Sequence, residues 1–210
     1  MLSKSDHDIA DAIRFFNKYS VEATYLVPTP IGLQKSIMDA TAPFRSYLRI
    51  KGVHEYNGQR QGTEGKKIID TFIVDETRLI PTKASLYRPK TKTGDPRVWI
   101  YGLAPYVEPH NLLAVVAHEG RLFVINVSRP DLMRTASDSK SPLNKLLMSV
   151  GQSSGDIAEE LLEKLKEIAK RGWIPTVTVG DTGIGATLEN CLGIMRNSSK
   201  KPDYKGIELK

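Results

Sequence analysis

The sequence predicts an α+β protein, in which a β-rich, barrel-like domain precedes the first helices and one strand of a second domain. Short segments rich in Val, Ile, Tyr and Leu fill residues 44–127, and turn residues such as Asn57-Gly58 and Glu119-Gly120 separate them. Amphipathic helical patterns flank this region on both sides. The length of 210 residues is enough for two small domains.

Two helices are expected before the strands. Apolar residues recur at every third or fourth position over residues 6–19, which is the period of one buried helix face. Thr29-Pro30 predicts the start of a second, short helix that reaches Asp39, because Thr caps helices well and Pro suits their first position.

Six strands are expected in a barrel or sandwich-like domain that ends near Arg129. They cover residues 46–56, 67–74, 79–87, 98–103, 112–117 and 122–127. Residues 112–126 have the pattern of a hairpin, with His118, Glu119 and Gly120 at its tip. We therefore place the first domain at residues 1–133.

Residues 134–155 are expected to form a linker, because they are rich in Ser, Gly, Asp and Lys apart from an apolar stretch that can form a short helix. A strong helix is predicted over residues 156–171. Asp156 and Glu159 form its expected capping pair, and Gly172 follows its end. The second domain is therefore expected to cover residues 156–210.

The net charge of +6 is concentrated in one segment. Residues 44–97 carry twelve Lys and Arg against six Asp and Glu, which accounts for the whole surplus. A basic surplus confined to one segment is typical of a surface that binds a polyanion such as DNA. A solvated basic face explains the same count, so the charge alone leaves both interpretations open.

The C-terminal residues form the motif P-D-x4-E-x-K. If residues 206–210 form a strand, Glu208 and Lys210 point to the same face, and Asp203 can join them across a bend. Two carboxylates suit a hard cation such as Mg²⁺, and a neighbouring Lys can orient the attacking water. This spacing favours metal-dependent hydrolysis of a phosphodiester. The alternative is an ordinary surface strand in which charged and buried aliphatic residues alternate.

Glu189 lies upstream on a predicted helix that follows Thr182-Gly183-Ile184-Gly185. The glycines permit a tight turn, and backbone N–H groups at the start of the helix can contact a phosphate. Taken alone this pattern is weak, because a loop that enters a helix with an exposed Glu explains it as well.

Together the two motifs resemble the MvaI/BcnI restriction endonuclease family and, more distantly, the mismatch-repair nickase MutH. The resemblance runs from Trp173 to Lys210 and consists of T-G-I-G-x-T-x-E, a Leu-rich helix and P-D-x4-E-x-K. It implies a PD-(D/E)xK nuclease fold, with Asp203 and Glu208 as ligands of Mg²⁺, Lys210 as the catalytic lysine and Glu189 as an accessory acid. It also implies a monomer that cuts a short, nearly palindromic duplex site containing CC/GG.

In that family a long remainder follows the catalytic lysine, whereas this sequence ends at Lys210. We therefore expect residues 156–210 to be the N-terminal portion of a nuclease domain within a longer protein. The 210-residue chain alone is expected to be inactive in cleavage.

A basic, β-rich domain ahead of such a segment resembles a type IIE enzyme with an EcoRII-type effector domain, although only in arrangement. Within it, residues 88–97 suit phosphate contacts, and their arginines suit paired hydrogen bonds to guanine. A mobile basic hairpin tip is the alternative. The candidate DNA-binding residues are Lys83, Arg88, Lys90, Lys92, Arg97, Arg49 and Lys51.

The sequence thus favours a type II restriction endonuclease that binds specific double-stranded DNA and cleaves it with Mg²⁺. Two alternatives stay open, namely a DNA-binding module or fragment without cleavage activity and a MutH-like repair nickase. Cys191 is the single cysteine, which excludes an intrachain disulfide and a Cys-rich zinc site. No apolar run approaches the ~18 residues of a membrane span and no signal peptide is evident, so we expect a cytoplasmic bacterial or archaeal protein without a membrane partner.

Overall fold

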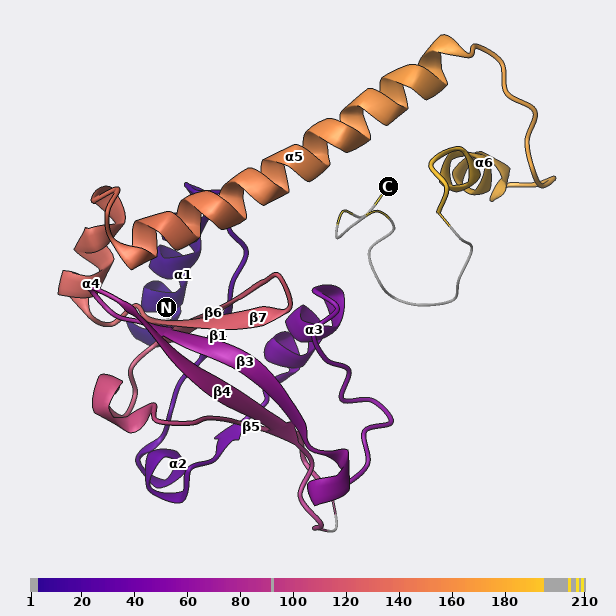
Figure 1. Ribbon diagram of the computed structural model, residues 1–210. Helices are drawn as coiled ribbons and strands as arrows, with labels where there is room; N and C mark the ends of the chain where they lie inside the picture. Colours follow the sequence, from indigo (N-terminus) through magenta and orange to yellow (C-terminus); the bar gives the residue numbers. More distant parts are fainter. Residues whose placement is uncertain (1–3, 92, 195–203, 205–206, 208, 210) are drawn as a thin grey trace. The chain divides into compact units, whose positions relative to one another are not determined.

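The computed structural model describes residues 4–91, 93–194, 204, 207 and 209 (Figure 1). It divides the chain into two compact units, which we call unit 1 (Met1–Gly151) and unit 2 (Gln152–Lys210). Each unit is described by itself below.

Unit 1 is built on one sheet that curves into a nearly closed barrel (Figure 1). Its strands are β1 (Thr24–Leu26), β2 (Met38–Asp39), β3 (Lys67–Val74), β4 (Leu79–Tyr87), β5 (Arg97–Ile100), β6 (Leu113–His118) and β7 (Arg121–Asn126). In the described residues the strand order is β1-β6-β7-β3-β4-β5-β2. All neighbours are antiparallel except β3 and β7, which run parallel. The short strands β1 and β2 are therefore the two edges that face the opening of the barrel.

The helices of the described chain are α1 (Lys4–Asn17), α2 (Pro30–Lys35), α3 (Ala42–Ile50), α4 (Pro130–Arg134), α5 (Pro142–Lys170) and α6 (Gly183–Cys191). Short 3₁₀ turns cover Thr63–Gly65, Ala104–Tyr106 and Thr135–Ser137. The Thr29 side chain caps α2 by accepting a hydrogen bond of 2.9 Å from the backbone N–H of Gly32, as the sequence predicts. The helix ends earlier than expected, because Ser36 adopts a left-handed conformation with φ 56°.

The expected strands at 67–74 and 79–87 are confirmed residue for residue as β3 and β4. The expected hairpin is confirmed as β6–β7, in which His118 pairs with Arg121. Glu119 and Gly120 connect them with φ values of 50° and 74°, both in the left-handed region. Two consecutive positive φ angles give the type I′ turn, whose twist matches that of the flanking strands.

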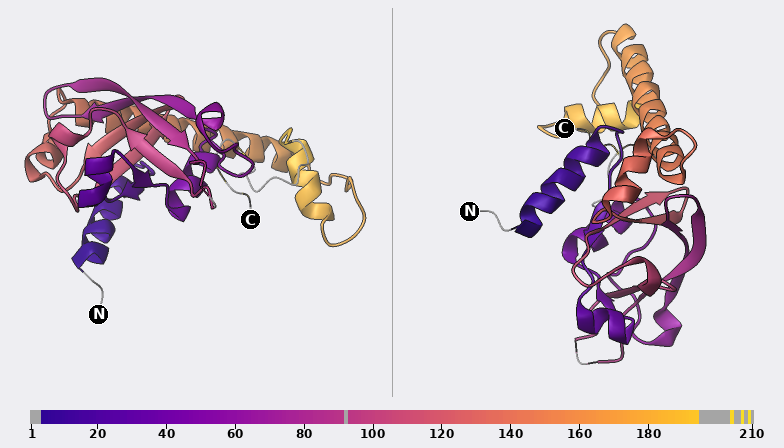
Figure 2. Two further views of the ribbon diagram at one scale, coloured as in Figure 1. Left: turned by 90° about the horizontal axis from the view of Figure 1, so that it is seen from below. Right: turned by 90° about the vertical axis from the view of Figure 1, so that its left-hand side faces the viewer.

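Two apolar clusters lie on opposite faces of the sheet. The inner cluster takes buried side chains from all seven strands, for example Leu113 and Val115 of β6, and fills the barrel. The outer cluster takes the alternate side chains, such as Ala114 and Val116, and packs them against α1, α4 and the first turns of α5. Figure 2 shows these helices against the sheet. The hairpin β6–β7 is therefore buried on both faces and forms the centre of unit 1.

The strand expected at residues 46–56 is wrong, because residues 42–50 form helix α3. The Thr41 hydroxyl accepts a hydrogen bond from the backbone N–H of Phe44 and caps the helix. Phe44 and Leu48, four residues apart, are fully buried in the inner cluster. That spacing places them on one helix face, so packing into the barrel outweighs the strand preference of the Tyr, Ile and Val in this segment.

Residues 142–170 form the single helix α5, which includes much of the segment expected as a linker. The Ser141 hydroxyl accepts a 3.0 Å hydrogen bond from the backbone N–H of Asn144 and caps the start of α5. Asp156 and Glu159 consequently lie inside a continuous helix, so the expected capping pair is wrong. Gly151 permits close packing, since a Cβ there would lie 2.2 Å from the Tyr19 carbonyl oxygen.

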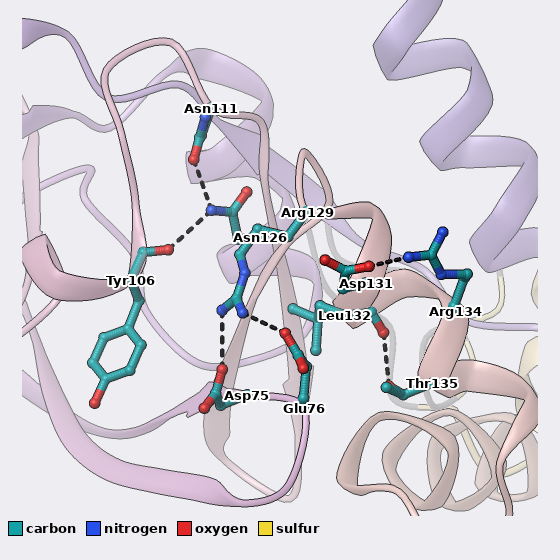
Figure 3. Close-up of polar contacts among 10 residues, drawn as sticks. All are labelled: Asp75, Glu76, Tyr106, Asn111, Asn126, Arg129, Asp131, Leu132, Arg134 and Thr135. Carbon is teal, nitrogen blue, oxygen red and sulfur yellow. Dashed lines mark hydrogen bonds and ion pairs between the residues drawn. The ribbon is translucent and has the colours of Figure 1, made fainter.

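A polar clamp joins the β3–β4 turn to the start of α4 (Figure 3). The Arg129 guanidinium donates to Asp75 at 2.9 Å and to Glu76 at 2.5 Å, and all three side chains are partly buried. We expect Arg129→Ala to lower the free energy of unfolding of unit 1 by about 1–2 kcal/mol, because two partly buried carboxylates lose their partner.

The matched control for this prediction is Arg134→Ala. Arg134 pairs with Asp131 on the same helix, but both side chains are about 70% exposed, so we expect a change within about 0.5 kcal/mol. Urea unfolding followed by tryptophan fluorescence measures both, because Trp99 is buried in unit 1 whereas Trp173 of unit 2 is fully exposed. Equal effects of the two substitutions would contradict the clamp.

Candidate nuclease segment and nucleic-acid interface

Unit 2 gathers a small apolar core between α5, α6 and the C-terminal residues. Leu161, Leu192 and Tyr204 are its buried members. The T-G-I-G-A-T segment forms the entry to α6 and its first turn. Of the second motif, Tyr204, Ile207 and Leu209 belong to this core.

Thr187 fixes the loop that precedes α6. Its hydroxyl donates to the Gly183 carbonyl at 2.7 Å and accepts from the Val177 N–H at 3.1 Å. Gly183 packs so closely against this loop that a Cβ would lie 2.6 Å from the Thr178 carbonyl oxygen. The loop therefore requires a residue without a side chain at Gly183 and a hydroxyl at Thr187, which explains these two positions of the motif by local structure.

We expect Thr187→Val to release this loop, because it removes the hydroxyl at constant side-chain volume and leaves the Val177 N–H without its partner. The cost is about 1–3 kcal/mol, which corresponds to roughly a tenfold faster amide exchange for each 1.4 kcal/mol. Hydrogen exchange at Val177 measures it. Thr187→Ser keeps the hydroxyl and is expected to keep most of the protection, so equal exchange in the two variants would count against this role.

Tyr204 ties the P-D-x4-E-x-K segment to α5. Its hydroxyl donates to Glu160 at 2.8 Å, and the Lys164 ammonium lies 5.1 Å from the centre of its ring. The hydrogen bonds of Lys164 to Tyr204 and to Glu160 raise the pKa of the lysine. Tyr204 and Ile207 exchange two backbone hydrogen bonds, of 2.9 and 2.7 Å, in an antiparallel bridge. The bend that the sequence predicts between Tyr204 and Gly206 lies mostly outside the described residues.

The three residues with predicted catalytic roles, Asp203, Glu208 and Lys210, lie outside the described residues. Glu189 is described and lies half-buried on α6. Among the described residues, no group of three or more His, Cys, Asp or Glu is placed to hold a metal ion. The roles of these four residues consequently stay predictions.

Arg88 and Arg97, expected to contact DNA, lie at the two ends of the β4–β5 connection. The Arg88 guanidinium donates to the carbonyls of Gly94 at 2.7 Å and Gln59 at 3.3 Å, so it holds its own loop together. Arg97 forms an ion pair with Asp39 across the β2–β5 pairing.

The other expected DNA-binding residues fall into two sets. On and beside α3, Arg49 lies 3.9 Å from Glu55, and Lys51 pairs with Glu22 at 2.6 Å. Lys83 on β4 and Lys90 in the connection are exposed. Lys92 lies outside the described residues. Lys90 and Arg88 therefore share the β4–β5 connection, while Arg49 and Lys51 belong to a different element.

Lys66 lies between two tyrosines, an arrangement that the sequence does not indicate. The Lys66 ammonium lies 3.0 Å from the Tyr101 hydroxyl and within 5.8 Å of the ring centres of Tyr87 and Tyr101. The hydrogen bond from Lys66 lowers the pKa of the Tyr101 phenol. Tyr87 lies beside Arg97 in the β4–β5 pairing, so aromatic and basic side chains share this part of the sheet.

A cavity of about 860 Å³ opens between the two edge strands of the barrel, and no local pattern in the sequence indicates it. Its walls come from both edge strands, from α2 and from the β4–β5 connection. The Asp39–Arg97 ion pair is part of the wall. The cavity thus lies beside the basic connection in which the sequence predicts DNA contacts.

Comparison with known proteins identifies the C-terminal segment. Residues 162–210 match the MvaI/BcnI restriction endonuclease family. The MvaI/BcnI match includes both motifs and suggests a DNA-cleaving type II enzyme, whereas unit 1 lies outside it. No curated protein and no solved structure matches the chain. No helix in the described part of the chain is both long and apolar enough to span a membrane.

Proposed function

We propose that this protein is a Mg²⁺-dependent type II restriction endonuclease in which unit 1 binds double-stranded DNA. The observation that supports cleavage is the order and spacing of the two motifs within the segment that matches the MvaI/BcnI family. DNA binding by unit 1 is supported by the basic surplus of residues 44–97, a segment that belongs to unit 1.

The residues fit magnesium by the chemistry of their donors. Asp203 and Glu208 supply carboxylate oxygens, the ligands that Mg²⁺ prefers. If the antiparallel register of the Tyr204–Ile207 bridge continues by one residue, position 203 comes opposite position 208 and the two carboxylates come close together. Mg²⁺, when bound, polarises the scissile phosphate and lowers the pKa of the attacking water.

The remaining roles belong to the side chains of the motif. Lys210 shares the face of Glu208 in a strand, so its ammonium can orient the attacking water and offset the charge that develops on the phosphate. Glu189 is proposed as an accessory acid, carried over from the family resemblance. Tyr204, which donates to Glu160, lies between the two proposed metal ligands in the sequence and is proposed to position them.

The arrangement of a basic barrel ahead of the nuclease segment also supports a type IIE-like enzyme, in which a separate domain binds an additional DNA copy. The same barrel supports the second candidate function, a DNA-binding module without cleavage activity, because unit 1 is a compact unit outside the family match.

A binding titration and a cleavage assay separate these functions. We expect the 210-residue chain to bind a random-sequence pool of duplexes in fluorescence anisotropy, with an affinity that falls as salt rises. Mg²⁺-dependent cleavage of DNA by the protein supports the endonuclease, whereas DNA binding without any cleavage supports the DNA-binding module. Absence of salt-sensitive binding would exclude DNA recognition by unit 1.

A further inference from the structure

The cavity between the edge strands β1 and β2 has the size and the polarity of a ligand site. Its volume of about 860 Å³ lies within the range of roughly 300–1,000 Å³ that small-molecule sites occupy. Aliphatic side chains such as Ile37 and Met38 form much of its wall, and a few polar groups converge on it. Such a mixture is typical of a pocket that binds a flat, partly polar molecule.

The polar groups of this cavity match the edge of a nucleobase. The Asp39 carboxylate only accepts hydrogen bonds and the neighbouring Arg97 guanidinium only donates them, so the ion pair presents an acceptor beside a donor. Every nucleobase carries a donor next to an acceptor on its Watson–Crick edge. An aliphatic ligand would leave this pair without a function.

The aromatic groups of the cavity add surfaces for stacking. Tyr25 of β1 and Tyr87 of β4 belong to its wall, together with Pro89. Burial raises the pKa of Tyr25 to about 12, and its hydroxyl, like that of any tyrosine at neutral pH, can donate a hydrogen bond. Tyrosine rings stack on bases of any sequence.

Cations in and beside the cavity wall favour a base that is still attached to DNA. Lys35 and Arg97 belong to its wall, and the exposed Lys90 lies between two wall residues, Pro89 and Thr91. Phosphates on either side of an extruded nucleotide would meet these charges. We propose that unit 1 binds one nucleobase, extruded from duplex DNA, in the cavity between β1, α2 and β2. This inference rests on the proposed DNA binding by unit 1.

Photocrosslinking with random-sequence duplexes tests the inference without knowledge of the recognition sequence. Four pools each carry one halogenated base: 5-iodouracil, 5-iodocytosine, 8-bromoadenine or 8-bromoguanine. After irradiation of the 210-residue chain with each pool, mass spectrometry maps the adducts. We expect an adduct on Tyr25 in at least one pool, because that ring belongs to the wall of the cavity in which the extruded base would stack.

Two pairs of variants make the test specific. Val27→Trp fills the cavity from a wall residue that is 46% exposed, and we expect at least a tenfold loss of the Tyr25 adduct. Its control, Val177→Trp, alters an equally exposed valine (49%) of unit 2 and is expected to have no effect.

The second pair changes one atom each. Asp39→Asn removes the charge of the ion pair and replaces one acceptor oxygen with an NH₂ donor, and it is expected to reduce the adduct several-fold. Asp131→Asn is its control, since Asp39 and Asp131 are 71% and 69% exposed and each pairs with an arginine.

The possible results are distinguishable. If the chain binds the pools in anisotropy but no pool gives a Tyr25 adduct, the inference is wrong while DNA binding stands. If the halogenated nucleoside monophosphates alone give the Tyr25 adduct and the duplexes do not, the cavity binds free nucleotides and the extruded base is excluded. Absence of duplex binding contradicts the proposed function of unit 1 and the inference together.

Discussion

Asp203→Asn is expected to lower the rate of Mg²⁺-dependent DNA cleavage by the natural protein by about 10²–10³-fold or more, the range seen when one preorganised group that stabilises a transition state is removed. The substitution keeps the size of the side chain but removes the charge that binds the cation. Lys210→Ala is expected to have a similar effect, and the double variant is expected to be no worse than either single one by more than a small factor, because the residues act together.

DNA binding is the readout that separates a catalytic defect from a folding defect. We expect both variants to bind duplex DNA at least as tightly as the unchanged protein, since loss of Asp203 removes a negative charge near the phosphates. The matched control is Asp181→Asn, which alters an exposed carboxylate just before α6 in the same unit. Cleavage that survives in Asp203→Asn would refute the assignment of the metal site.

The strands of unit 1 could be predicted where local pattern and tertiary packing agree. β3 and β4 are rich in β-branched and other apolar residues, and turn residues bound both strands, so their limits follow from the sequence. The parallel pairing of β3 with β7 has no such local signal, because it joins segments about fifty residues apart. The sheet order therefore had to come from the structure.

Helix α3 shows how composition can mislead. Residues 46–56 contain Tyr, Leu, Ile and Val, which favour strands, yet the decisive features are the Thr41 cap and the four-residue spacing of Phe44 and Leu48. Both signals were present in the sequence. Thr41 and Phe44 precede the expected strand, whereas the β-branched residues Ile50 and Val53 within it favour a strand.

The chemistry of the basic residues was the least predictable part. Arg88 counts as one positive charge in the sequence, but its guanidinium is committed to backbone carbonyls of its own loop. The cavity is still harder to predict from the sequence, because its wall combines Tyr25, Met38 and Arg97, which come together only when the barrel folds. Composition thus located the basic domain, whereas the availability of each cation depends on its neighbours in space.

Some cations of the β4–β5 region are exposed, whereas Arg88 is bound to carbonyls of its own loop. We therefore expect different effects when the two kinds are removed. Lys83→Ala combined with Lys90→Ala is expected to reduce the slope of log K against log salt by about two, since each lost phosphate contact contributes about 0.9. At physiological salt the affinity is expected to fall at least about tenfold. Both side chains are exposed, so the thermal stability of unit 1 is expected to stay unchanged.

Arg88→Ala is expected to behave in the opposite way. Its guanidinium makes hydrogen bonds of 2.7 Å to Gly94 and 3.3 Å to Gln59, so its loss should loosen the β4–β5 connection and lower stability by about 1–2 kcal/mol. The salt slope should change by less than one. Lys140→Ala with Lys145→Ala is the control, because it removes two exposed charges near the start of α5. If that control lowers the slope as much as the Lys83 and Lys90 pair does, DNA binds unit 1 without preference for the β4–β5 surface.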